Sequence, residues 1–187
     1  MVGVDPIQTK VDLVNQSHTP IIEQEIGEII AANVKSGRLR VVVDPLEAIQ
    51  KTNLSFVCVG TPSQSNGNLD LRFIRRICEQ IGDALKRKSS KTTVVIRSTV
   101  LPGTMRDIVI PILEESSQKK AGVDFGLCHN AEFLREGSAV RDVYGPPKTV
   151  IGELDRPSGC LLAQLYEKLD APLIRTSVET AETVGTH

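Results

Sequence analysis

The sequence has little that would suit it to nucleic acid or to a membrane. It contains no Trp, two Tyr and four Phe, which are too few aromatic rings for a base-stacking platform. Its 22 basic and 23 acidic residues leave a formal net charge of −1, so no positive field attracts phosphate backbones or anionic lipids. No apolar run approaches the roughly 20 residues of a membrane-spanning helix, and the first ten residues lack a secretion signal. We therefore expect a cytoplasmic protein with no nucleic-acid or membrane partner.

The four cysteines do not form a metal or disulfide framework. No two of them have the C-x-x-C spacing of zinc or redox sites, and no metal site is expected. We expect Cys58, Cys78 and Cys160 to be small buried apolar side chains. Cys128 precedes His129, which leaves a nucleophile and base as an alternative. That pairing is disfavoured because neighbouring side chains of an extended segment point to opposite faces.

Short runs of β-branched residues alternate with helical patterns along the 187 residues. Each run is brief, continuous and bounded by Gly, Pro, Asp or Asn, which is typical of strands buried on both faces of a parallel sheet. With 40% hydrophobic and 24% charged residues, the chain has the composition of a globular domain. The expected strands are residues 41–43, 54–59, 92–97, 149–152 and 172–174.

The clearest helix lies between the second and third of these strands. Ile74, Ile77, Ile81 and Leu85 recur there at spacings of three and four, and Asp70 is the expected N-cap. A strand, a helix and a strand in succession make a parallel βαβ unit, so the alternation predicts an α/β fold with a doubly wound, mostly parallel sheet. Further helices are expected at residues 46–51, 105–116 with a kink at Pro111, and 159–169.

In a doubly wound sheet, ligands bind beyond the carboxyl ends of the strands. Asp5 ends the first apolar run, where a carboxylate could accept hydrogen bonds from ribose hydroxyls, although a turn or a helix cap is the commoner role. Thr61 follows Gly60 after a strand, in a sequence that also suits a tight turn. Thr99 precedes a Pro-Gly turn. A helix beginning near Thr104 could face an anion with its N–H groups, but capping explains Thr104 equally well.

Two carboxylates, Glu132 and Glu136, stand four residues apart in the segment N-A-E-F-L-R-E-G. On a helix they would share one face, and burying both as anions would require partners. One of them would then suit proton transfer. A solvated helix face is the plainer alternative.

Taken in order, these segments resemble the nucleotide-sugar 6-dehydrogenase family, which includes the UDP-glucose and GDP-mannose dehydrogenases. The resemblance covers nearly the whole chain, from Met1 to about Glu182, and its strength lies in the ordered set of motifs. Residues 61–63, 66–71 and 150–155 are most similar to the GDP-mannose branch. The motifs that carry the resemblance are G-V-D at 3–5, Lys10, V-G-T-P at 59–62, R-S-T-V-L-P-G-T at 97–104 and E-F-L-R-E at 132–136.

The resemblance implies a Rossmann-like NAD-binding domain in an enzyme that oxidises a sugar C6 alcohol to a carboxylate, by two hydride transfers to NAD. Asp5 and Lys10 would hold the adenosine end of NAD. Thr61 and Thr99 would line its nicotinamide side, and Thr99 would also orient a water.

The same resemblance assigns the substrate site. Glu132 and Glu136 would belong to the sugar and water site, one of them assisting proton transfer during thioester hydrolysis. Phe133 and Leu134 would present backbone groups to the nucleotide sugar, GDP-mannose or UDP-glucose. Catalytic roles therefore fall to Thr99, Glu132 and Glu136. Full-length members of the family are expected to be homo-oligomers.

The sequence departs from the family at both ends. No G-x-G-x-x-G turn occurs, and we expect the first βα unit to be lacking, which would leave strand edges unpaired. An incomplete NAD-binding domain is expected at residues 1–178 and the start of a linker helix at 179–187, with Gly185 in place of a Lys. None of the cysteines has the context of the family's nucleophile. Without that thiolate, we expect the isolated chain to be inactive.

Two readings of function remain open. The first is an NAD-dependent dehydrogenase of the GDP-mannose branch, with UDP-glucose as the alternative substrate. The second is a non-catalytic fragment that associates with intact subunits through exposed strand edges and apolar faces. A free-standing mononucleotide-binding module is disfavoured because the pyrophosphate turn is missing.

Overall fold

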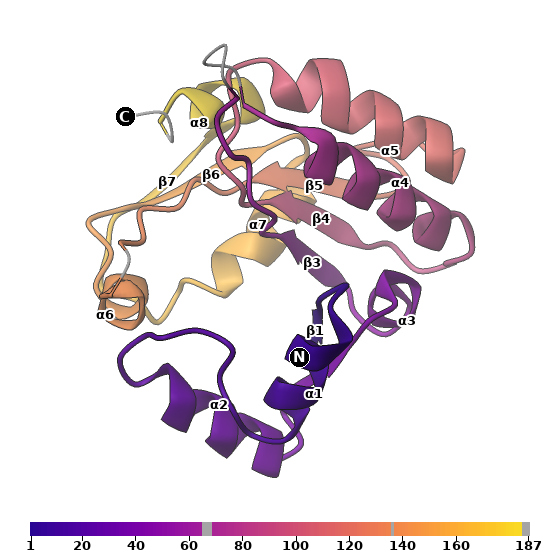
Figure 1. The fold of residues 1–187 in the computed structure, drawn as a ribbon. Helices are drawn as coiled ribbons and strands as arrows, with labels where there is room; N and C mark the ends of the chain where they lie inside the picture. The colour runs from indigo at the N-terminus through magenta and orange to yellow at the C-terminus, as the bar shows by residue number, and fades with distance from the viewer. Residues whose placement is uncertain (65–68, 136, 185–187) are drawn as a thin grey trace.

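The computed structural model describes residues 1–64, 69–135 and 137–184, which form an α/β fold with two sheets (Figure 1). β1 and β2 make the smaller sheet, and the larger sheet has the order β3-β4-β5-β6-β7. All paired strands are parallel except β5 and β6, so the mostly parallel sheet is confirmed. The strands are β1 (Val2–Val4), β2 (Arg40–Val42), β3 (Leu54–Val57), β4 (Thr93–Ile96), β5 (Gly126–His129), β6 (Thr149–Glu153) and β7 (Leu173–Ser177).

Helices cover both faces of the larger sheet (Figure 1). α4 and α5 lie over one face, and α7 lies over the other. Within the described part of the chain, no helix is both long and apolar enough to cross a membrane. The helices are α1 (Gln8–Asn15), α2 (Ile26–Lys35), α3 (Pro45–Gln50), α4 (Arg72–Lys86), the π-helix η1 (Met105–Val109), α5 (Ile110–Ser117), α6 (Ala139–Tyr144), α7 (Arg156–Gln164) and α8 (Val178–Val184).

The core alternates between the two faces because successive strand residues point to opposite sides. In β4, Val94 and Ile96 face α4 and α5, whereas Val95 faces α7. The larger cluster is completed by apolar side chains of α4 and α5, and the smaller one contains Ile151 and Leu162. Both faces of the central strands are therefore buried in apolar clusters.

The predicted burial holds for the central strands and fails at the edges. Every residue of β4 and β5 is buried, but Phe56 in β3 is 37% exposed, and Leu173 and Ile174 in β7 are also exposed. Among the described residues, β1 and β3 each pair along one edge only. Phe56 therefore lies on an edge strand of the larger sheet as the described residues form it.

α4 follows the predicted pattern closely. It buries Ile74, Ile81 and Leu85, while Ile77 stays partly exposed. Asp70 stands two residues before the helix, and its carboxylate accepts the N–H of Arg72 at 3.0 Å. Asp70 therefore satisfies a first-turn N–H group, as expected, although the helix starts later than its position suggested.

The helix expected at residues 105–116 has an irregular first part. Residues Met105–Val109 form a π-helix, and α-helical geometry begins at Ile110. Pro111 has no N–H to donate to the carbonyl of Asp107, so the regular i to i−4 pattern is interrupted at this point. Where the sequence predicted a kink, the structure has a π-helical turn just before Pro111.

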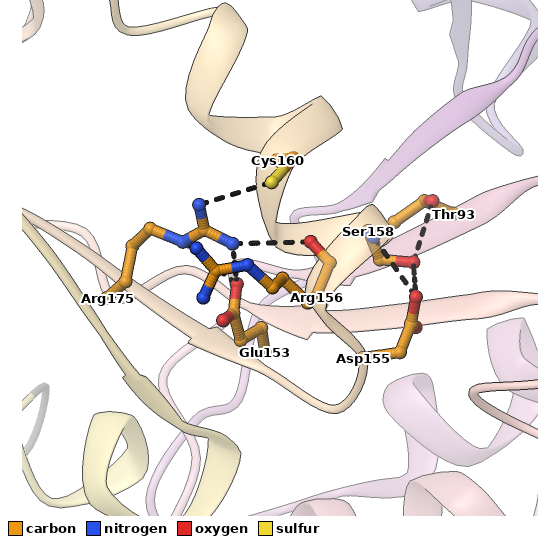
Figure 2. A network of polar contacts seen from close by, with 7 residues as sticks. All are labelled: Thr93, Glu153, Asp155, Arg156, Ser158, Cys160 and Arg175. Atoms are coloured by element: carbon orange, nitrogen blue, oxygen red, sulfur yellow. Dashed lines mark hydrogen bonds and ion pairs between the residues drawn. The ribbon is translucent and has the colours of Figure 1, made fainter.

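Polar contacts hold the start of α7 against the sheet (Figure 2). The Asp155 carboxylate accepts the backbone N–H and the hydroxyl of Ser158 at 3.1 and 2.9 Å, which begins the helix three residues before the predicted start. The Ser158 hydroxyl also accepts from the Thr93 hydroxyl at 3.3 Å. Gly126 makes room for this contact, because a Cβ there would lie 1.7 Å from the Ser158 Oγ.

Two of the three cysteines predicted to be buried are exposed. Cys58 follows an edge strand, and Cys160 lies on the outer side of α7, where Arg175 Nη1 donates to its sulfur at 3.3 Å (Figure 2). Arg175 also pairs with Glu153 at 2.5 Å. Cys78, a residue of α4, is buried as predicted, and all four cysteines are free thiols.

Candidate functional site

The ends of β3 and β4 meet at the carboxyl edge of the larger sheet. The hydroxyl of Thr61 donates to the carbonyl of Thr99 at 2.9 Å, and the buried Ser98 hydroxyl donates to the carbonyl of Val59 at 2.6 Å. The loops after the two strands are therefore held as one unit. Thr99 itself is exposed, and its hydroxyl makes no hydrogen bond with a described residue, so it can meet a ligand. The structure thus brings Thr61 and Thr99 together, as the sequence predicted.

A residue of α8 holds the loop between β4 and η1. Glu182 is fully buried, and its carboxylate accepts the backbone N–H groups of Gly103 at 2.8 Å and Met105 at 2.7 Å. The Thr104 hydroxyl donates back to the carbonyl of Leu101 at 2.6 Å. The predicted anion at this helix start is therefore a carboxylate of the chain itself.

Asp5 and Lys10 form a separate pair at the end of β1. One carboxylate oxygen of Asp5 accepts the N–H of Ile7 at 2.8 Å, which is the turn role that the sequence left open. The other oxygen lies 3.9 Å from the Lys10 ammonium, and both side chains are partly exposed. Between described residues, no hydrogen bond joins this pair directly to Thr61 or Thr99.

Residues 130–135 and 137–138, called here the β5–α6 loop, contain the remaining predicted residues that the structure describes. Residues 131–135 are not helical, so the shared helix face expected for Glu132 is wrong. Glu132 instead accepts the N–H of Leu134 at 2.7 Å, a local bond that competes with helix formation. The Lys148 ammonium lies 5.3 Å from the ring centre of Phe133. Glu136 lies outside the described residues, as do residues 65–68, which belong to a predicted motif, and Gly185.

The β5–α6 loop folds around one buried carboxylate, Asp142 of α6. Asp142 accepts the backbone N–H of Arg135 at 3.0 Å and its guanidinium at 2.7 and 3.1 Å, and it also accepts the Ser138 hydroxyl at 3.1 Å. The Arg135 guanidinium holds the pKa of Asp142 well below its usual range. The loop and α6 therefore form one clamped unit.

A polar network that sequence reasoning missed anchors the start of this loop. Asn130 is buried and donates to the carbonyl of Val150 at 2.9 Å. Arg97 Nη1 donates to the Asn130 side chain at 3.2 Å and to the Tyr166 hydroxyl at 2.9 Å, and Tyr166 also bonds Asn130. Arg97 and Asn130 directly follow β4 and β5, so the strand-end rule could have found them. Nothing in the sequence marks Tyr166, which follows α7.

Cys58 directly follows β3, and its sulfur is desolvated although the residue as a whole is exposed. Packing around its sulfur desolvates the thiolate and raises the pKa of Cys58, while the charge of Arg97 lowers that pKa and the charge of Glu132 raises it further. The charges of Arg97 and Glu132, which follow β4 and β5, thus both act on the thiol that follows β3. Glu132 thus belongs to the same neighbourhood as the ends of β3 and β4.

The adjacent Cys128 and His129 do not make a nucleophile and base. Both are buried in β5, and burial raises the pKa of the Cys128 thiol to about 12. Burial also lowers the pKa of His129 to about 4, so both side chains are neutral near pH 7. Within the described chain, no cluster of three or more His, Cys, Asp and Glu side chains could hold a metal.

Comparison with known sequences identifies relatives of this arrangement. Residues 1–170 match the UDP-glucose/GDP-mannose dehydrogenase family, NAD binding domain. The chain is 53% identical to the GDP-mannose 6-dehydrogenase of Azotobacter vinelandii, over 98% of its own length and 42% of that relative. It is 30% identical to a UDP-glucose 6-dehydrogenase of Bacillus subtilis, over 98% of its length and 39% of that relative. The chain therefore spans about two fifths of the length of these relatives.

Solved structures agree with the sequence comparison. A ternary complex of GDP-mannose dehydrogenase from Pseudomonas aeruginosa matches with a TM-score of 0.97 and 50% identity, covering 98% of this chain and 42% of that one. A UDP-glucose dehydrogenase from Pyrobaculum islandicum matches with a TM-score of 0.92 and 33% identity, covering 98% of this chain and 42% of that one. The predicted Rossmann-like fold is confirmed.

Proposed function

The chain belongs to the UDP-glucose/GDP-mannose dehydrogenase family, and from this membership we propose that it supplies the NAD-binding domain of a GDP-mannose 6-dehydrogenase. The identity of 53% with a GDP-mannose enzyme, against 30% with a UDP-glucose enzyme, supports GDP-mannose as the nucleotide sugar. We place the domain at residues 1–178 and the start of a linker helix at 179–187. The cytoplasmic location and the homo-oligomeric state stay predictions.

The observation that carries the proposal is the hydrogen bond between Thr61 and Thr99, because it joins two loops at the strand ends where such folds bind dinucleotides. The Thr61 hydroxyl is used in this bond and fixes the backbone of Thr99. The exposed Thr99 hydroxyl is then positioned to line the nicotinamide side and to orient a water. When bound, NAD supplies the acceptor for a hydride from the sugar C6.

Asp5 and Lys10 fit the adenosine end of NAD. One oxygen of Asp5 is held by the N–H of Ile7, which fixes the carboxylate, and the other faces Lys10 and solvent. An oriented carboxylate at the end of a strand accepts hydrogen bonds from ribose hydroxyls. Lys10 offers a positive charge to the same end of the dinucleotide.

The β5–α6 loop supplies the sugar side of the proposed site. Its start is fixed by Asn130 and its end by the contacts of Asp142 with Arg135, so the backbone between them presents N–H and C=O groups in one arrangement. Glu132 would hold the sugar or exchange a proton with water, with Phe133 and Leu134 beside it. Glu136 is assigned to the same site from the sequence alone.

The chemistry that this chain can complete is limited by its thiols. Hydrolysis through a thioester needs a thiolate beside the sugar C6, and none of the four cysteines stands in the sequence context of the family's nucleophile. We therefore propose that these residues contribute to binding NAD and the nucleotide sugar and that none of their four cysteines is the nucleophile. The unpaired edges of β1 and β3 support a second candidate function, association with intact subunits of a related enzyme.

Isothermal titration tests the proposed binding. We expect saturable binding of NAD+, followed by tighter binding of GDP-mannose than of UDP-glucose, and no steady increase in NADH absorbance. Absence of NAD+ binding would refute the proposed domain function, and tighter UDP-glucose binding would refute the choice of substrate. Native mass spectrometry of the chain mixed with an intact GDP-mannose dehydrogenase tests the second function, which requires mixed assemblies.

A further inference from the structure

Glu23 joins two parts of the molecule that are far apart in sequence. Its carboxylate accepts the backbone N–H of Gly137 at 2.9 Å through one oxygen and the N–H of Ala139 at 2.9 Å through the other. Figure 1 shows the segment before α2 lying beside α6, where these bonds form. A carboxylate that accepts two N–H groups makes a charge-assisted and geometrically specific contact.

The contact connects residues 1–44, called here the N-terminal lobe, to the β5–α6 loop. β1 and β2 of this lobe are not paired with the larger sheet. Among the hydrogen bonds between described residues, only the two of Glu23 reach from the lobe beyond α3, and Arg40 bonds Glu47 within α3 at 2.8 Å. Glu23 is therefore the direct polar link between the two halves of the proposed site.

Among the described residues, the N–H groups of Gly137 and Ala139 bond only Glu23. Ser138 precedes α6, but its hydroxyl donates to Asp142 and does not cap the helix. The first N–H groups of a helix need an outside acceptor, and a negative charge is favourable at that end. Asp142 bonds both Arg135 and Ser138, so a displacement at the start of α6 can reach Arg135 through this carboxylate.

We propose that Glu23 is a positioning residue that couples the N-terminal lobe to the β5–α6 loop. This inference rests on the proposed function, in which the lobe holds the adenosine end of NAD through Asp5 and the loop holds the nucleotide sugar through Glu132. NAD that orders the lobe then also orders the loop through Glu23. Since such coupling is reciprocal, each ligand strengthens the binding of the other.

Amide hydrogen exchange without ligands tests the contact itself. In Glu23→Ala we expect the exchange of the Gly137 and Ala139 amides to become about tenfold faster, because each loses a hydrogen bond to a charged group. Glu23→Gln keeps one acceptor oxygen and should give an intermediate rate. Glu28→Ala is the matched control, since this exposed glutamate of α2 makes no side-chain hydrogen bond with the described residues. Unchanged exchange in Glu23→Ala would overturn the proposal.

Binding measurements test the coupling. In the wild-type chain, saturating NAD+ should tighten GDP-mannose binding about fivefold or more. Glu23→Ala should bring that ratio close to one while changing the affinity for NAD+ alone less than twofold, and Glu28→Ala should keep the wild-type ratio. A Glu23→Ala chain that keeps the wild-type ratio would refute coupling through this residue. If the wild-type chain binds neither ligand, the proposed function fails. The amide exchange rates then still test whether Glu23 holds the start of α6.

Discussion

The buried His129 makes a quantitative prediction about acid stability. The side chain is 2% exposed in β5, and its Nδ1 has no partner among the described residues. Burial lowers the pKa of His129 from 6.5 to about 4, and a hydrogen bond with the backbone of Ile96 only partly opposes this shift. The folded protein therefore keeps this imidazole neutral well below the pH at which the unfolded chain protonates it.

The sign of the effect follows from proton linkage. The contribution is fully present above the unfolded pKa of 6.5, and it is lost as the pH falls toward the folded pKa of about 4, because only the unfolded state gains the proton in this window. A shift of this size corresponds to a free energy of unfolding smaller by about 2 kcal/mol at about pH 5, and by roughly 3 kcal/mol once both states are protonated.

Urea denaturation at about pH 7 and about pH 5 measures this loss. His129→Gln removes the titrating group, so its stability should fall by about 2 kcal/mol less between these conditions than that of the wild type. Carboxylates titrate in both proteins and cancel in the comparison. The exposed His18→Gln variant is the matched control and should follow the wild type. Equal acid losses in His129→Gln and the wild type would refute the reasoning.

Three further substitutions test packing and the cofactor site. Gly126→Ala should lower the free energy of unfolding by about 3 kcal/mol in urea denaturation, since its Cβ would collide with Ser158. Gly60→Ala is its control and should change the free energy of unfolding by less than about 0.5 kcal/mol, because no described atom lies within 4 Å of the added Cβ; similar losses in the two variants would contradict this. Thr61→Val removes one hydrogen bond of 2.9 Å and should weaken NAD+ binding about fivefold in calorimetry; unchanged affinity would argue against this loop contact. Asp5→Asn should weaken NAD+ binding about tenfold and improve NADP+ relative to NAD+, because it removes a charge that repels the 2′-phosphate; an unchanged preference would place the ribose elsewhere.

Local patterns in the sequence predicted the regular elements well. The spacing of Ile74, Ile81 and Leu85 located α4, because one apolar face suffices to describe a helix packed on a sheet. β5 was not predicted, since Gly126–His129 is short and its burial comes from the strands and helices around it. The helix expected at residues 105–116 begins where predicted, but its first part is a π-helix because Pro111 lacks an N–H. The start of α7 differed because Asp155 caps it through the backbone N–H of Ser158.

The candidate site was predictable only where it follows strand ends. Asp5, Thr61 and Thr99 stand directly after apolar runs, so position in the chain was enough to select them. Glu23 and Tyr166 act through contacts with residues 114 and 36 positions away, and no local pattern encodes such pairs. The exposure of Cys58 likewise depends on an unpaired sheet edge, which is a property of the assembled fold.

The most direct test of the account follows amide signals by NMR during titration with NAD+. If the ends of β1, β3 and β4 form one dinucleotide site, the amides of Asp5, Thr61 and Thr99 should shift together along a single saturation curve. Later addition of GDP-mannose should then shift Glu132 and Leu134. Shifts that leave Asp5, Thr61 and Thr99 unchanged, or that saturate at different NAD+ concentrations, would contradict the single site.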